Sequence, residues 1–251
     1  PDRVFFLPAP RRQRPSVTRK HCPQRIIRSV PAWFLLKYPV LKHPLTKNVY
    51  HPNSRKQAVI VLPSTLKGFG WEKERQVSFD EIVEAAMQAA PYSCFINPDA
   101  PCFANPDSMI DSIQKYCSDT NQKVPETIGE IARCIYESLA YRYKQVLQNL
   151  QKLADFPIQK LHIIGGGSKN NMLNQFTANA IGMQVIAGPS EATAIGNILM
   201  QAKAAGLVEN KIIMRDIVRN STALELFNPE DVETWDRNYN KYLEVFLEDK
   251  E

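Results

Sequence analysis

Residues 161–185 read LHIIGGGSKNNMLNQFTANAIGMQV, and this stretch decides the fold. A short apolar run predicts a buried strand, three consecutive glycines follow it, and the next segment has the apolar spacing of a helix. Gly182 predicts the end of that helix, because glycine adopts the left-handed C-cap conformation without strain. The run MQVIAG, which starts at Met183, then predicts a second strand.

A second helix follows the second strand. The segment SEATAIGNILMQAKAAG, residues 190–206, predicts a helix that Ser190 caps and Gly206 ends. The order strand, helix, strand, helix indicates an α/β fold, in which helices cover a sheet.

Other helices flank this unit on both sides. Ser78 and Glu81 have the capping-box spacing at the start of a helix over 78–89. Asn105 is the expected N-cap of a helix over 105–117. A long helix is expected over 124–154, starting near Pro125, and two closing helices over 211–221 and 229–248. The long helix has one apolar stripe that predicts core packing: Ile128, Ile131, Ile135, Leu139, Tyr143, Val146, Leu150 and Leu153.

The three glycines Gly165, Gly166 and Gly167 permit a sharp turn from strand into helix. Their peptides carry no side chains and can approach a ligand closely, and the helix start presents unpaired N–H groups and a partial positive charge. Asn170 and Asn171, expected one turn into the helix, suit a purine edge or a ribose hydroxyl. Two interpretations stay open on the residues alone: a nucleotide or anion site, or a tight turn that binds nothing.

Neither common phosphate-binding motif is present. The Rossmann pattern would need glycine at position 170, where the chain has Asn170. The Walker pattern, in which four residues separate a glycine from Gly-Lys, is missing. Downstream, GPSEATAIGN (188–197) places another glycine at a strand end. The small residues Ala192, Ala194 and Gly196 favour either close helix packing or the approach of a ligand, and Glu191 suits its own helix's positive end.

The first 70 residues have an unusual composition. Fourteen Lys or Arg and ten Pro fall there, with no acidic residue between Asp2 and Glu72, whereas the whole chain has a net charge of +5. The prolines exclude long helices and central strands. Three interpretations of this segment stay open. It could be a basic arm that contacts nucleic acid, an extended segment that wraps over the folded domain, or a non-native segment from a shifted reading frame, and the last is favoured. We expect 1–70 to be irregular and 71–251 to form the folded domain.

Metal and membrane chemistry have little support. The five cysteines are irregularly spaced with no CxxC pair, and the four histidines form no ligand pattern, so no metal site is expected. No apolar run reaches the roughly 18 residues of a membrane helix, and no secretory signal opens the sequence. The expected location is therefore the cytoplasm.

The stretch LHIIGGGSKNNMLNQFTANAIGMQVIAGPSEATAIGNILMQAKAAG resembles the C-terminal part of the FGGY carbohydrate kinases. The likeness extends upstream through CFANPDSMIDSIQKYC and VPETIGEIARCIYESLAYRYKQVLQ, over about residues 72–235. It implies the C-terminal domain of the actin-like ATPase (ribonuclease H-like) fold. It also implies that Gly165, Gly166 and Gly167 meet ATP, with Asn170 and Asn171 near the adenosine. Within the family the chain is most similar to members that phosphorylate L-rhamnulose at O1. The resemblance also implies ATP with Mg²⁺ as cofactors, the Mg²⁺ being held mainly by the ATP phosphates.

Other parts of the family pattern have no counterpart in these 251 residues. The sugar site, the catalytic aspartate and two phosphate-binding turns lie upstream in these kinases, and residues 1–66 do not match them. We therefore assign no catalytic residue and expect no kinase activity from the 251 residues alone. A nucleic-acid binder with a basic arm and a non-enzymatic remnant are the alternatives. Nucleic acid is the less favoured partner, because the arm has too few aromatic side chains for stacking.

Overall fold

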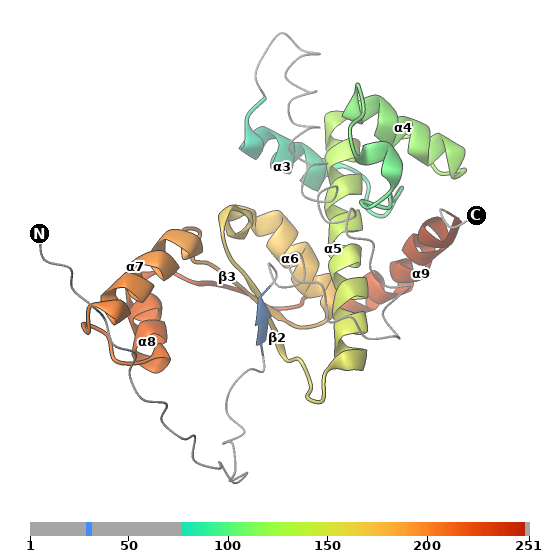
Figure 1. Cartoon of the computed structure of the whole chain (residues 1–251). Coiled ribbons are helices and arrows are strands. Elements are labelled where there is room, and N and C mark those ends of the chain that lie inside the picture. The colour runs from blue at the N-terminus through green and yellow to red at the C-terminus, as the bar shows by residue number, and fades with distance from the viewer. Residues whose placement is uncertain (1–28, 32–76, 249–251) are drawn as a thin grey trace, which may run out of the picture.

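The computed structural model describes residues 29–31 and 77–248, and Figure 1 shows their arrangement. Four strands form one sheet in the order β1 (Ser29–Pro31), β2 (Lys160–Ile163), β3 (Gln184–Ala187) and β4 (Glu225–Phe227). The first three strands are parallel and β4 is antiparallel to β3. The predicted α/β fold, with helices beside a small sheet, is confirmed.

Strand β1 comes from the segment 1–70, which the sequence predicted to be irregular. Its three residues pair in parallel with β2, where Val30 is the partner of Leu161. The sequence did not predict this strand, because one apolar residue between Ser29 and Pro31 gives no strand signal of useful length. Residues 1–28 and 32–70 lie outside the described residues.

The unit β2–α6–β3 forms as the sequence predicted. Helix α6 (Asn171–Ile181) connects the two strands and ends at Gly182, whose φ is +64°. Leu161 and Val185 are fully buried partners in adjacent strands, and they pack in a small core with residues of α5 and α6. Because β2 and β3 are parallel, their carboxyl ends lie side by side.

Helix α5 (Ile128–Leu153) is the central helix, against which α3 (Phe79–Gln88), α6 and α9 (Val232–Glu248) pack (Figure 1). The predicted stripe is partly confirmed, since Ile131, Ile135 and Leu139 are buried whereas Leu153 is exposed. The predicted stripe includes too few of the buried residues, because other elements pack on α5 from several sides and bury further residues. These are Gly129, Ala132, Cys134, Tyr136, Glu137, Ser138, Ala140, Tyr141, Lys144 and Leu147.

Helix α9 docks on α5 through an aromatic cluster. The Tyr141 hydroxyl donates to the carbonyl of Trp235 at 2.9 Å, and the two ring centroids are 5.1 Å apart. Lys144 forms an ion pair with Asp236 and lies 4.6 Å from the centroid of the Tyr239 ring. These contacts join residues over 90 positions apart and close the helical layer.

The helix caps were predicted unevenly. The capping box of Ser78 and Glu81 is present at α3, with both backbone-to-side-chain hydrogen bonds. The Asn105 cap was wrong: α4 (Met109–Asp119) begins after Ser108, whose Oγ accepts from the Asp111 N–H at 3.2 Å. Helix α5 likewise begins after Thr127 and not near Pro125, because Thr127 forms its own capping box with Glu130.

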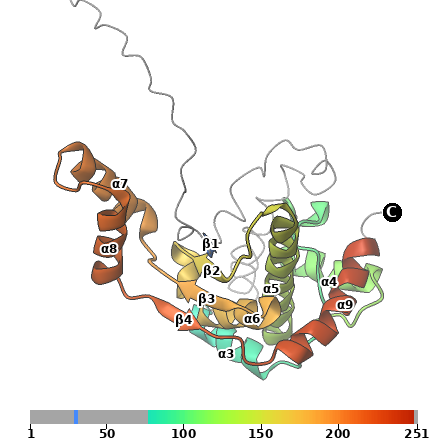
Figure 2. The same ribbon diagram turned by 90° about the horizontal axis from the view of Figure 1, so that it is seen from below.

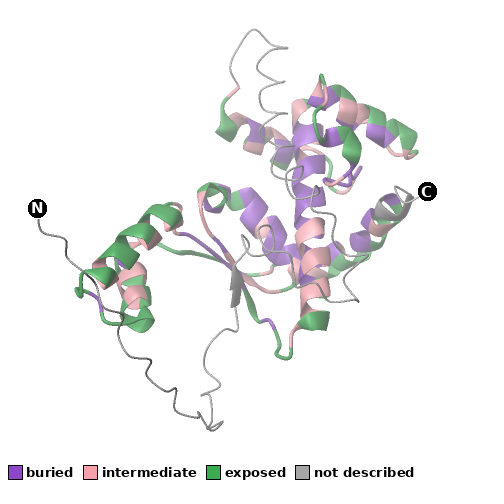
Figure 3. Ribbon diagram, in the orientation of Figure 1, coloured by how far each residue is buried: buried purple, intermediate pink, exposed green. Residues whose placement is uncertain are grey.

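Helices α7 (Ala192–Ala204) and α8 (Lys211–Ser221) lie to one side of the sheet, away from α5 (Figure 2). Most of their surface is exposed (Figure 3). The predicted Ser190 cap was wrong, because α7 begins after Glu191 and has no side-chain cap. Gly206 does end the helix region, with a φ of +76°. Strand β4 was not predicted, since Glu225 and Leu226 are exposed and three residues carry no periodic signal.

Within residues 29–31 and 77–248, no helix combines the length and the hydropathy that crossing a membrane requires.

A buried carboxyl group lies where α3 and α5 meet. Glu137 is 1% exposed, forms an ion pair with Arg133 at 2.8 Å and accepts from the Tyr92 N–H at 2.9 Å. Arg133 also donates to the carbonyl of Ala86 and lies over the Phe176 ring. Burial raises the pKa of Glu137 to about 7, although Arg133 and the Tyr92 N–H oppose the rise.

This pKa predicts how stability depends on pH. Between about pH 4.5 and 7 the folded protein keeps a proton on Glu137 that the unfolded chain has lost, so ionisation lowers stability as pH rises. The free energy of unfolding of the wild type, relative to Glu137→Gln, is expected to fall by roughly 1–3 kcal/mol from pH 5 to pH 8. Urea unfolding at several pH values measures this difference.

Glu130→Gln is the matched control. The partners Lys123, Glu126 N–H and Thr127 N–H lower the pKa of Glu130 to about 2, so Glu130 is ionised in both states above pH 5. The difference in free energy of unfolding between Glu130→Gln and the wild type is therefore expected to stay constant from pH 5 to pH 8. A constant difference for Glu137→Gln as well would contradict the prediction.

Candidate nucleotide site at the glycine turn

The turn after β2 is built from main chain. Gly165 has a φ of +83°, which favours glycine, and Gly166–Lys169 form a short 3-10 helix, η3. The Ser168 N–H and Oγ both donate to the carbonyl of Gly165, at 3.0 and 2.8 Å. The turn is therefore held from within, and its outer face is left open.

The open face belongs to the glycines. Gly166 and Gly167 are exposed, and a Cβ atom built on Gly165, Gly166 or Gly167 would meet no atom within 4 Å. Packing within the described residues therefore does not explain three glycines here, although the φ of Gly165 explains one. The space beside Gly166 and Gly167 leaves room for a ligand against the peptide groups, and the binding of a nucleotide there stays a prediction.

Asn170 and Asn171 take different places from each other. Asn170 is the N-cap of α6: it is 7% exposed, and its Oδ1 accepts from the Leu173 N–H at 3.0 Å. Asn171 is the first residue of the helix and is exposed. The prediction that both lie one turn into the helix was wrong, because Gly166–Lys169 use a 3-10 turn before α6 begins.

Two buried side chains beneath the turn were not identified from the sequence. The Asn174 Nδ2 donates to the carbonyl of Ser168 at 2.9 Å, and Asn174 is fully buried. Tyr136 of α5 is also fully buried; burial raises its pKa, whereas the neighbouring side chain of Asn170 acts to lower it. Polar residues on the buried face of α6 were the one available signal, since such residues need partners.

The segment after β3 is joined to the glycine turn. The Gly188 N–H donates to the carbonyl of Ile163 at 2.8 Å, and the Gly165 N–H donates to that of Pro189 at 3.0 Å. The Gly188–Pro189 peptide bond is cis. Gly188 has a φ of +108°, and a Cβ there would lie 3.0 Å from the carbonyl oxygen of Ala223. These bonds fix the start of α7 beside the turn.

The small residues of α7 do not pack closely within the described residues. Ala194 is exposed, Ala192 and Gly196 are partly exposed, and a Cβ at Gly196 would meet nothing within 4 Å. The interpretation as close helix packing is therefore not supported in the described part of the chain. Glu191 is exposed at the helix start, where its charge suits the positive end of α7.

The charge around the turn suits an anion. Lys169 is exposed at the end of η3, and residues 165–171 contain no carboxylate. A separate hollow of about 850 Å³ lies between α3, α4 and α5, but carboxylates line it: Glu81, Glu84, Asp111 and Glu126. Because like charges repel, that hollow is a poor site for phosphates and the glycine turn is the better one.

The sequence matches a known family over most of its length. Residues 24–205 match the C-terminal domain of the FGGY family of carbohydrate kinases. The match extends further upstream than the predicted boundary at residue 71 and includes part of the basic segment. The origin of that segment stays a prediction.

Two bacterial relatives named rhamnulokinase show the same likeness. The protein from Bacteroides thetaiotaomicron is 51% identical over 162 residues, which are 64% of this chain and 33% of the relative. The protein from Bacillus subtilis is 46% identical over 156 residues, 62% of this chain and 32% of the relative. The chain thus spans about a third of the length of the curated relatives it matches.

Solved structures agree on the fold. The gluconate kinase from Lactobacillus acidophilus superposes with a TM-score of 0.52 at 15% identity, over 76% of this chain and 38% of that one. The Plasmodium falciparum glycerol kinase with ADP gives 0.51 at 15% identity, over 74% and 36%. At this identity the likeness shows the fold alone. The family match, the relatives and the fold agree, and this chain belongs to the FGGY family of carbohydrate kinases.

Proposed function

We propose that this domain binds ATP at the turn formed by Gly165, Gly166 and Gly167, as the nucleotide-binding part of a sugar kinase. The observation that carries the proposal is the open, side-chain-free face of Gly166 and Gly167 beside a helix start. Peptide groups there can meet a ribose or a phosphate without steric hindrance. The family match over residues 24–205 supports the same function.

The residues of the turn have separate roles in this proposal. Gly166 and Gly167 contact the nucleotide through their peptides, and Gly165 sets the direction of the chain. Asn171, exposed at the first position of α6, is proposed to contact the adenosine directly. The Asn170 side chain is occupied by capping, so its part is to hold the turn in shape. Lys169 adds positive charge for the phosphates.

The proposed reaction transfers the γ-phosphoryl group of ATP to O1 of L-rhamnulose. The sugar rests on the names of the two relatives, which are 51% and 46% identical over about a third of their own length. Mg²⁺, which neutralises charge on the transferred group, is proposed to bind mainly to the ATP phosphates, because the turn itself offers no carboxylate. No catalytic base is assigned in this chain, and a cytoplasmic location stays a prediction.

Isothermal titration of the 251-residue chain with ATP and Mg²⁺ tests the binding proposal. We expect saturable binding of one nucleotide, and no heat beyond dilution would overturn the proposal.

A fluorescent DNA duplex titrated at two salt concentrations tests the alternative partner: tight, salt-dependent DNA binding without ATP binding would favour the nucleic-acid binder. Absence of both would favour a non-enzymatic remnant. Kinase activity toward L-rhamnulose is expected to be absent in the 251 residues alone, and its presence would overturn only that expectation.

A methyl group at Gly196 tests whether α7 forms part of the nucleotide site. Gly196→Ala meets no atom within 4 Å and removes a helix-interior glycine, so stability should rise by up to about 1 kcal/mol. If the nucleotide approaches this face of α7, the affinity for ATP should fall by roughly tenfold or less, because one added methyl displaces a close contact. Calorimetry and urea unfolding of the same variant measure the two effects. Unchanged ATP affinity would remove α7 from the proposed site.

A further inference from the structure

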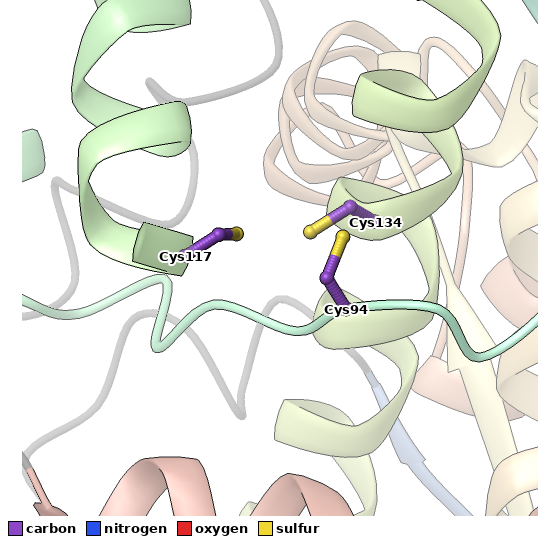
Figure 4. A group of neighbouring side chains, drawn as sticks. All are labelled: Cys94, Cys117 and Cys134. Carbon is purple, nitrogen blue, oxygen red and sulfur yellow. The ribbon is translucent and has the colours of Figure 1, made fainter. Parts of the chain in front are cut away.

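Three thiol groups meet in the helical layer, far from the glycine turn in sequence. Cys94 lies in the segment between α3 and η2 (Pro101–Phe103), Cys117 near the end of α4, and Cys134 in the second turn of α5. Their sulfur atoms all lie within 4.8 Å of one another, and Figure 4 shows the three side chains pointing toward a common centre. The irregular spacing along the chain gave no sign of this, and the expectation of no metal site rested on that spacing alone.

The environment of the cluster is dry. Cys94, Cys117 and Cys134 are 4%, 0% and 2% exposed, and none of them is in a disulfide. Thiolates are the preferred ligands of soft cations such as Zn²⁺ and Cd²⁺. With metal–sulfur bonds of about 2.3 Å, tetrahedral angles place sulfur atoms about 3.8 Å apart. The sulfur–sulfur distances, all within 4.8 Å, are thus close to the spacing that three sulfur ligands of one ion require.

The cluster is held in place by hydrogen bonds on either side. Next to Cys94, the Phe95 N–H donates to Gln122 Oε1 at 2.7 Å, and Gln122 N–H donates to the Cys117 carbonyl at 2.9 Å. The Ile96 N–H donates to Ser138 Oγ at 3.0 Å, and that hydroxyl donates to the Cys134 carbonyl at 2.6 Å. The two residues that follow Cys94 are therefore tied to the carbonyl groups of Cys117 and Cys134 through Gln122 and Ser138. These bonds preorganise three ligands from three elements.

Binding of a cation displaces the protons of the three thiols. These protons leave to solvent as three metal–sulfur bonds form, and a divalent ion leaves a net charge of −1.

We propose that Cys94, Cys117 and Cys134 bind one thiophilic divalent cation, of the Zn²⁺ and Cd²⁺ class, through three thiolates. Among the described residues, no other Cys, His, Asp or Glu joins this group. The ion would join the 89–100 segment, α4 and α5, so its role is structural. The competing interpretation is three core thiols that pack as small apolar side chains and bind nothing.

Titration with Cd²⁺ tests the proposal on the fully reduced, metal-free 251-residue protein. One equivalent is expected to produce the ultraviolet sulfur-to-cadmium charge-transfer band, and Zn²⁺ should remove it by competition. Cys102→Ser is the matched control, because Cys102 is exposed and outside the cluster. It should leave the titration unchanged, whereas Cys134→Ala should weaken binding by roughly a hundredfold or more, since even loss of an outer partner costs 10- to 100-fold.

A second measurement serves if Cys134→Ala fails to fold. Alkylation of the native wild type, followed by mass spectrometry, should be slowed at least about tenfold by Cd²⁺ at the three cluster cysteines, because bound metal stabilises the closed form. The rate at Cys102 should not change. Absence of the charge-transfer band, equal slowing at Cys102, or a disulfide between two of the three cysteines in protein purified without reductant would each overturn the proposal.

Discussion

Replacing Gly166 by aspartate is expected to weaken ATP binding by roughly a hundredfold while the fold stays intact. Gly166 is exposed, its φ lies outside the left-handed region, and a Cβ there meets no atom within 4 Å, so the side chain fits without strain. In the proposed complex the new carboxylate would repel the ATP phosphates, and two like charges about 5 Å apart repel by about 3 kcal/mol at an effective dielectric constant of about 20. Repulsion of about 3 kcal/mol would then raise the dissociation constant by roughly a hundredfold.

Gly166→Asn separates charge from bulk. Asparagine has nearly the same size as aspartate and no charge, so it should weaken binding less than Gly166→Asp does. Calorimetry with ATP at low and high salt measures both variants, and the gap between them should narrow as salt screens the repulsion. Urea unfolding should show that both variants keep the stability of the wild type. Equal ATP affinity in wild type and Gly166→Asp would contradict the site.

The second large effect concerns Gly129, where α3 and α5 approach closely. A Cβ at Gly129 would lie 2.3 Å from the carbonyl oxygen of Ala85 and 2.8 Å from its carbon, and both atoms belong to the backbone. A backbone group cannot move aside as a side chain can, so Gly129→Ala must push α3 away. The steric cost of about 3 kcal/mol is offset by about 1 kcal/mol of helix propensity, and a net loss of about 2 kcal/mol is expected.

Gly196→Ala is the matched control for Gly129→Ala. Both glycines lie inside helices, but only Gly129 faces another backbone, so the propensity gain appears alone at Gly196. Urea unfolding of the two variants should therefore give changes of opposite sign. A stable Gly129→Ala protein would show that the two helices are further apart than described.

The unit β2–α6–β3 could be predicted well from the sequence, because its signals are local. Apolar runs that end at glycine, as β2 does before Gly165 and α6 does at Gly182, combine a burial pattern with a backbone requirement. The capping box of Ser78 and Glu81 was equally local, and it formed. These features depend on neighbours in sequence, so a single sequence contains them.

Other features depend on contacts that sequence reasoning does not supply. Ser108 and not Asn105 caps α4, because residues 104–108 are not helical, and the capping role of Asn170 follows from the 3-10 turn before α6. Asn174 and Tyr136 contribute to the candidate site only because α5 and α6 pack together. The cysteine cluster likewise joins residues 23 and 17 positions apart in sequence that the fold makes neighbours.

The central claim is that a bare glycine turn between β2 and α6 receives ATP. A crystal structure of the 251-residue chain with a non-hydrolysable ATP analogue and Mg²⁺ tests it most directly. The account predicts that the nucleotide lies against the peptides of Gly166 and Gly167, with Asn171 beside the adenosine. A nucleotide bound elsewhere, for example in the hollow between α3, α4 and α5, with the turn left free, would contradict it.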